Sequence, residues 1–254
     1  IQYLLTDSYE AQLQNWTPKM AERFLQRNGY DLKPWLPALA GVIIGDSEQT
    51  ERFLWDYRMT IGQLFAENYC RLNDIVKDYG MRGRYTEAHE NGKEFVMDGM
   101  DIKKTAQIPM SATWVPFRIA TGTQGYMADA DVRESASVSH LYGQKFVACE
   151  SLTVPGDHKR AYTFCPENLK PTIDQEFAAG ANRIVIHESA HQPRDDKFPG
   201  LGLLHYGQWF NRHETWAHLA RVWTDYIART SFLLQQGQFV GDILVYYGED
   251  SAVC

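Results

Sequence analysis

The chain alternates short apolar segments with helical segments five times, and this order constrains the fold more than any other feature. Strand-like segments lie at Tyr3–Glu10, Lys145–Glu150 and Asn182–His187, and two more begin near Gly83 and Gln107. Strands that alternate with helices form a parallel sheet, and their carboxyl ends share one face. The sequence therefore predicts an α/β fold with all five strand ends on that face.

Local signals place the helices between these strands. Thr17-Pro18 predicts an N-cap followed by Pro at the first helical position, and Gly29 supplies the stop. Asp46 is expected to cap one long amphipathic helix that ends at Gly80. Further helical regions are expected around Asp101 to Thr105, at Asp131 to Leu141, at Pro166 to Ala179 with an interruption at Pro171, and at about Glu214 to Gln235.

The number of strands bears on the type of sheet. A β/α barrel contains eight strand–helix units, whereas this chain of 254 residues shows five, so the sheet is either open or an incomplete barrel. Both termini lie beside apolar runs and look cut from a longer chain. An incomplete sheet exposes edges and apolar faces, which predicts self-association of such a piece.

Composition excludes two classes of partner. The formal net charge is -7, and nucleic-acid binders usually carry a basic patch or stripe. No run of about 18 apolar residues is present, so no membrane span is expected. The four cysteines show neither metal-type nor disulfide-framework spacing, which leaves the redox compartment open.

Acidic residues follow several of the predicted strands. A single acid at a strand end is more often a cap or a partner of a helix dipole. Several on one rim, with Trp and His nearby, can supply a general acid and a general base that flank a glycosidic bond. The acids are Asp7, Glu10, Glu87, Glu90, Glu150 and Glu188.

A second pattern is His187-Glu188-Ser189-Ala190-His191, which matches the H-E-x-x-H motif of zinc peptidases, with Glu214 as a candidate third ligand. That motif requires a helix that brings both His onto one face. Here β-branched residues precede His187, and Pro193 follows His191 by two residues. The favoured interpretation places His187 at a strand end and His191 in the loop beyond.

Short motifs over nearly all of the chain form a specific combination. They are Asp7-Ser8-Tyr9-Glu10 with Gln14-Asn15-Trp16-Thr17, Gly29-Tyr30-Asp31-Leu32-Lys33-Pro34-Trp35-Leu36-Pro37, Glu134-Ser135-Ala136-Ser137-Val138, Gly143-Gln144, Ala148-Cys149-Glu150-Ser151-Leu152-Thr153, His187 to Pro193, Gly207 to Trp216, and Leu233-Leu234-Gln235-Gln236-Gly237. Together they resemble glycoside hydrolase family 106, the α-L-rhamnosidases.

The resemblance implies a (β/α) TIM-type barrel, truncated here to about strands 4–8 over residues 1–238, with residues 239–254 as a final strand or the start of a following domain. It also implies a general acid on strand 4, a general base on strand 7, inversion at a terminal α-L-rhamnosyl residue, and a calcium ion at the sugar. Counting strands back from Arg183–His187 assigns Glu10 as the acid and Glu150 as the base.

The resemblance also implies the rest of the site. In the family an acidic residue is expected beside the Trp after Ile-Pro-Met, but Ala112 and Thr113 precede Trp114 here, so Glu87 is the substitute calcium ligand. The expected setting is carbohydrate metabolism on plant-type glycans, in the periplasm or outside a bacterial cell. An inactive, sugar-binding barrel fragment is the alternative, beside the zinc peptidase. Residues expected to bind substrate are Asp7, Trp16, His89, Trp114, His187, His191 and Trp209.

Overall fold

The computed structural model describes residues 1–11, 14–88, 97–115, 129–154, 161–203 and 209–246. Its described part contains a parallel sheet in which every strand pairs with its neighbour in sequence, in the order β1-β2-β3-β4-β5. This sequential order is that of a barrel wall. The strands are β1 (Tyr3–Thr6), β2 (Gly83–Thr86), β3 (Ile108–Trp114), β4 (Ala148–Thr153) and β5 (Arg183–Ile186).

The helices largely follow the sequence prediction, except that α1 begins at Met20 after Lys19, so Thr17 is not its N-cap and Pro18 is not its first residue. The long helix begins at the expected cap, because the Asp46 carboxylate accepts a hydrogen bond of 2.8 Å from the backbone N of Gln49. The first helix ends where Gly29 adopts the left-handed conformation, with φ 80°. The helices are α1 (Met20–Asn28), the 3-10 helix η1 (Lys33–Ala40), α2 (Ser47–Asp78), α3 (Gly99–Lys103), α5 (Asp129–Tyr142), α6 (Pro166–Ala179), the 3-10 helix η3 (Ala217–Leu219) and α7 (Ala220–Leu234).

The sheet curls strongly, so that its two edge strands approach each other. Four strand spacings of about 4.8 Å would separate the edges of a flat sheet by about 19 Å. The side chains of the two edge strands nevertheless meet, because the guanidinium carbon of Arg183 on β5 lies 6.0 Å from the ring centre of Tyr3 on β1. The fold is therefore α/β with a curled, five-stranded parallel half-barrel, consistent with part of a TIM-type barrel.

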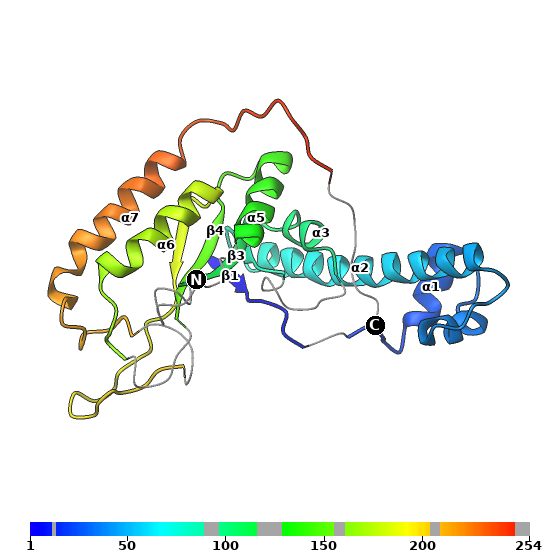
Figure 1. The fold of residues 1–254 in the computed structure, drawn as a ribbon, viewed down its shortest axis with the longest axis horizontal. Helices are drawn as coiled ribbons and strands as arrows, with labels where there is room; N and C mark the ends of the chain where they lie inside the picture. The colour runs from blue at the N-terminus through cyan, green and yellow to red at the C-terminus, as the bar shows by residue number, and fades with distance from the viewer. Residues whose placement is uncertain (12–13, 89–96, 116–128, 155–160, 204–208, 247–254) are drawn as a thin grey trace.

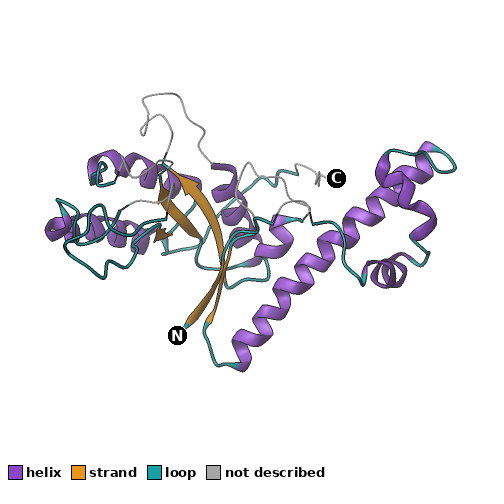
Figure 2. Ribbon diagram, turned by 90° about the horizontal axis from the view of Figure 1, so that it is seen from below, coloured by secondary structure: helices purple, strands orange, loops and turns teal. Residues whose placement is uncertain are grey.

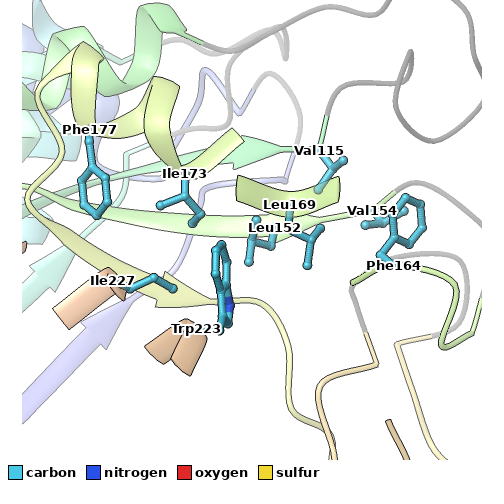
Figure 3. Close-up of a cluster of buried hydrophobic side chains, with 9 residues drawn as sticks. All are labelled: Val115, Leu152, Val154, Phe164, Leu169, Ile173, Phe177, Trp223 and Ile227. Atoms are coloured by element: carbon cyan, nitrogen blue, oxygen red, sulfur yellow. The ribbon is translucent and has the colours of Figure 1, made fainter. Parts of the chain in front are cut away.

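The two faces of the sheet bury different side chains. On the concave face, Ile108, Met110 and Ala148 pack with Tyr3 and Tyr85. On the convex face, α6 packs on β4 and α7 packs on β5 and α6, and Figure 3 shows the apolar cluster that fills this layer. That cluster consists of Val115, Leu152, Val154, Phe164, Leu169, Ile173, Phe177, Trp223 and Ile227.

A helical lobe extends from the sheet along α2. Figures 1 and 2 show α1 and η1 packed against the end of α2 that lies farthest from the strands. The lobe has its own core, in which Phe24, Phe53 and Tyr57 are almost completely buried. No helix in the described residues, the 32-residue α2 included, is long and apolar enough to cross a membrane.

Several boundaries differ from the sequence prediction. Helix α6 runs through Pro171 without the expected interruption. A proline in the second turn removes one backbone hydrogen bond, and the apolar face of α6 packed on β4 offsets that loss. The last α-helix begins at Ala220, later than Glu214. Residues Val240 to Tyr246 lie outside the sheet with exposed side chains and form no strand; the start of a following domain stays a prediction.

A buried carboxyl group on the convex side makes stability depend on pH. Burial raises the pKa of Glu176 to about 8, although a hydrogen bond from Ser151 opposes the shift. Because the folded-state pKa exceeds the ordinary 4.5, the folded chain holds this proton more tightly, and stability falls as the pH rises between these values. We expect Glu176→Gln to remove roughly 3–5 kcal/mol of this loss by pH 9. Urea unfolding of the wild type and of Glu176→Gln at pH 5, 7 and 9 measures the free energy of unfolding of each. The same dependence on pH in both proteins would refute the role of Glu176.

Candidate active site

Three carboxylates converge on the concave face of the sheet. Asp7 follows β1, Glu87 follows β2 and Glu150 lies within β4, yet carboxylate oxygens of all three lie within 4.8 Å of one another. Strand β3 separates β2 from β4, so only the curl of the sheet brings the three groups together. The carboxyl ends of the strands thus form an acidic site, which is the face where parallel β/α folds carry their active sites.

Backbone hydrogen bonds extend the pairing of β1 and β2 beyond the strands and fix the acidic segment. The N–H of Glu87 donates to Thr6 at 3.1 Å, and the N–H of Tyr9 donates to Ala88 at 3.1 Å. Glu10 follows at once and is exposed, and the hydroxyl of Ser8 donates to its carboxylate at 2.8 Å. Glu10 therefore lies three residues beyond Asp7 in the segment that follows β1, with an exposed side chain.

Glu87 has an unusual environment for a carboxylate. The side chain is completely buried, and neither oxygen has a hydrogen-bond partner in the part of the chain that the structure describes. Burial, followed by the charges of Glu150, Asp131 and Asp7, raises the pKa of Glu87 well above its ordinary value. The buried Lys103 opposes this shift, but it is already paired with the carboxylates of Asp131 and Glu134. The site accordingly favours either a proton or a cation at Glu87.

The chemistry of this group fits calcium. Calcium takes oxygen ligands, carboxylates above all. Asp7, Glu87 and Glu150 supply carboxylate oxygens within reach of one ion, and a cation would satisfy the two orphaned oxygens of Glu87. Glu87, the predicted metal ligand, thus has two further carboxylates beside it. One of them, Asp7, was expected only as a substrate-binding residue.

The side chains of Thr153 and His187 lie next to the carboxylate of Glu150. The hydroxyl of Thr153 donates to Oε1 of Glu150 at 3.4 Å and lies 3.0 Å from Nδ1 of His187. His187 follows β5, and its Nδ1 is 4.0 Å from the same carboxylate oxygen. Glu150 was expected to close its strand, but β4 continues to Thr153, so Glu150 stands inside the strand. Thr153 was not singled out in the sequence, because simple alternation directs it to the opposite face from Glu150.

A bulge in β4 explains how Thr153 reaches the concave face. Ser151 pairs with Thr113 and Thr153 pairs with Trp114, so Leu152 is an extra residue in the ladder. Leu152 has φ 74°, the left-handed conformation, and its side chain is completely buried in the convex cluster (Figure 3). Such a conformation costs a non-glycine residue about 1–3 kcal/mol and persists only where the surroundings enforce it.

The remaining predicted site residues are spread more widely. Trp114 ends β3 opposite Thr153 and is half-buried, and His191 is exposed in the loop after β5. Trp16 is 46% exposed, in the segment that leads into α1. Trp209 is buried against Tyr162, with ring centres 5.5 Å apart. The prediction for His89 lies outside the described residues.

The zinc-peptidase pattern lacks the geometry it requires. Residues 187 to 191 are irregular and not helical, so His187 and His191 do not present ligands from one helical face. Glu188 instead accepts a hydrogen bond of 2.9 Å from the backbone N of Leu203. Within the described ranges, the residues grouped as potential metal ligands are the three acids, without either histidine. Glu214 is buried, and burial raises its pKa to about 7.

A curled parallel β/α sheet with clustered acids at its carboxyl edge is compatible with a barrel glycosidase and with other barrel enzymes. Comparison with protein families specifies the class further, since the family described as alpha-L-rhamnosidase matches residues 1–254. The chain belongs to glycoside hydrolase family 106, the α-L-rhamnosidases.

The chain is also similar to two known proteins. The structure of a rhamnosidase from Novosphingobium sp. PP1Y is 45% identical, with a TM-score of 0.86 over 98% of this chain and 23% of that one. A "Putative beta-glucuronidase" of Formosa agariphila is 37% identical over 97% of this chain and 20% of its own length. The chain thus spans less than a quarter of either protein.

The zinc-peptidase alternative is wrong, because neither the family nor the geometry supports it.

Proposed function

We propose that the natural polypeptide that carries residues 1–254 is an inverting α-L-rhamnosidase, which removes terminal α-L-rhamnosyl residues from plant-type glycans. The observation that carries the proposal is the convergence of Asp7, Glu87 and Glu150 at the carboxyl edge of the half-barrel, in a chain of this family. We also propose a periplasmic or secreted bacterial setting.

The two catalytic roles proposed here are those that the family resemblance and the strand count assign. In our proposal Glu10, which is exposed, donates a proton to the leaving oxygen. Glu150 takes a proton from the water that attacks the anomeric carbon from the opposite face. Inversion requires about 6.5–9.5 Å between the two carboxyl groups, so that the water fits between base and sugar. His187 and Trp114 lie beside Glu150 and Thr153, and both would border the bound sugar.

Calcium is the proposed cofactor, held by Glu87 and Asp7 next to Glu150. When bound, calcium would supply a positive charge that holds sugar hydroxyl groups. The chain's own part is to present buried carboxylate oxygens and to keep Lys103 occupied by Asp131 and Glu134, so that Lys103 does not neutralise the site. Trp16, His191 and Trp209 stay predicted substrate-binding residues, as does His89.

The assay that tests the proposed function compares two sugars. Under the proposal the natural polypeptide hydrolyses an aryl α-L-rhamnoside and leaves an aryl β-D-glucuronide intact. The reverse preference would refute it in favour of the activity named for the Formosa agariphila protein. The 254 residues alone are assayed in parallel; sugar binding without turnover by both polypeptides would support an inactive, sugar-binding fold instead.

The role of Glu10 predicts a dependence on the leaving group. A general acid matters most when the leaving oxygen is basic, because a stabilised leaving group departs without protonation. We expect Glu10→Gln to lower kcat/KM by about 10²- to 10⁴-fold on a rhamnosyl disaccharide and far less on a nitrophenyl rhamnoside. Steady-state kinetics on both substrates measure the difference. Equal losses on both substrates would remove Glu10 from the acid role.

A further inference from the structure

We propose that Thr153 is a positioning residue that orients the carboxylate of Glu150, and that His187 in turn holds the Thr153 hydroxyl. The inference rests on the proposed function, because it concerns the base of that reaction. It assigns a purpose to the left-handed bulge at Leu152, which the catalytic assignment alone does not explain.

The first observation is a chain of three side chains, Glu150, Thr153 and His187, that meet at the Thr153 hydroxyl. The Thr153 hydroxyl donates its hydrogen to Oε1 of Glu150 at 3.4 Å. The same hydroxyl oxygen lies 3.0 Å from Nδ1 of His187, and the tautomer with its hydrogen on Nδ1 makes His187 the donor to that oxygen. Thr153 is 2% exposed, so water does not compete freely for its hydroxyl. The three groups come from β4 and the end of β5, two paired strands, so neighbouring backbones fix them.

The second observation is the bulge itself. Glu150 and Thr153 are three residues apart, so an uninterrupted strand would place them on opposite faces. The extra residue Leu152 shifts the register against β3 and turns its own side chain into the convex cluster. Thr153 is thereby returned to the face of Glu150. A strained conformation enforced beside a functional carboxylate is the kind of outlier from which a role is inferred.

The chemistry explains why such an orientation matters. A general base must aim one oxygen lone pair at the attacking water, and a misplacement of about 1 Å costs much of the rate. A hydrogen bond from Thr153 to Oε1 restricts rotation of the carboxylate. The other oxygen of Glu150 is then the one presented to water. Because only orientation is affected, loss of the hydroxyl should act on kcat and leave substrate binding intact.

The test uses substitutions of matched size in the natural polypeptide, assayed on an aryl α-L-rhamnoside. Thr153→Val removes the hydroxyl and keeps the shape, and we expect kcat to fall about 10- to 100-fold with KM unchanged, the range for a lost hydrogen bond to a charged group. Thr153→Ser restores the hydroxyl and should recover most of kcat. Thr113→Val is the control, because Thr113 is equally buried, on the neighbouring strand and outside the proposed chain.

A double-mutant cycle completes the test. If His187 acts on Glu150 through Thr153, His187→Ala should add little to the loss of kcat in Thr153→Val, whereas independent roles would multiply the losses of kcat. A direct contact of His187 with the bound sugar is measured separately, as a change in KM. Wild-type kcat in Thr153→Val, or multiplied losses in the double variant, overturns the inference while leaving the proposed function intact. Circular dichroism shows whether Thr153→Val is folded. If it is not, the values of kcat of Thr153→Ser and Thr153→Ala are compared instead, and equal values would overturn the inference. A wild-type protein inactive on rhamnosides overturns both.

Discussion

Replacing Glu150 by Gln is expected to lower kcat on an aryl α-L-rhamnoside by about 10²- to 10⁴-fold, the contribution typical of general base catalysis. Gln keeps the size of the side chain and an oxygen that accepts the Thr153 hydrogen bond, but it cannot take a proton from water. The fold should persist, since Gln has nearly the same shape and volume as Glu. Steady-state kinetics with thermal unfolding as a check measure both effects.

Glu150 is also one of the three acids near the proposed calcium site, so its two possible roles must be separated. If Glu150 were only a metal ligand, excess calcium would restore activity to Glu150→Gln. We expect no recovery at millimolar calcium. Activity within tenfold of wild type, with or without calcium, would exclude Glu150 as the base.

Replacing Glu87 by Gln is expected to abolish stabilisation by calcium. Glu87 is completely buried with two oxygens that have no hydrogen-bond partner among the described residues, so it gains most from a bound cation. Calcium at about 100 times its dissociation constant should raise the free energy of unfolding of the wild type by about 2.7 kcal/mol. In Glu87→Gln that increase should vanish. Thermal unfolding with calcium and with a chelator measures the difference.

Glu176→Gln is the matched control for this experiment. Glu176 is also a buried glutamate, but it lies on the convex side, hydrogen-bonded to Ser151. We expect it to respond to calcium as the wild type does. A calcium response that survives in Glu87→Gln would show that calcium binds without Glu87, and a wild type without any response would show that the acidic cluster holds no calcium; either result contradicts the proposed site.

The helices show how far local sequence signals reach. Asp46 and the apolar spacing after it predicted α2 almost to the residue, because capping and periodicity are local properties. Pro171 misled the prediction of α6, since packing on β4 outweighs one lost hydrogen bond. The apolar run Val240 to Tyr246 looked like a strand, but within the described residues no strand lies beside it, and a strand requires a partner.

The site was predictable only in part, for a physical reason. Glu150 and Glu87 were recognised as acids near strand ends, but their approach depends on the curl of the sheet, which is a long-range property. Thr153 could not be found, because a left-handed leucine looks in sequence like any other leucine. The pairing of Lys103 with Asp131 beneath the acids was equally invisible, since these residues lie on separate helices.

The stereochemistry of the released sugar tests the central claim most directly. Proton NMR can follow the anomeric signals during hydrolysis of an aryl α-L-rhamnoside before the product mutarotates. A general acid and a general base acting from opposite faces predict β-L-rhamnose as the first product. First release of α-L-rhamnose would mean retention through a covalent intermediate, and it would contradict the roles assigned to Glu10 and Glu150.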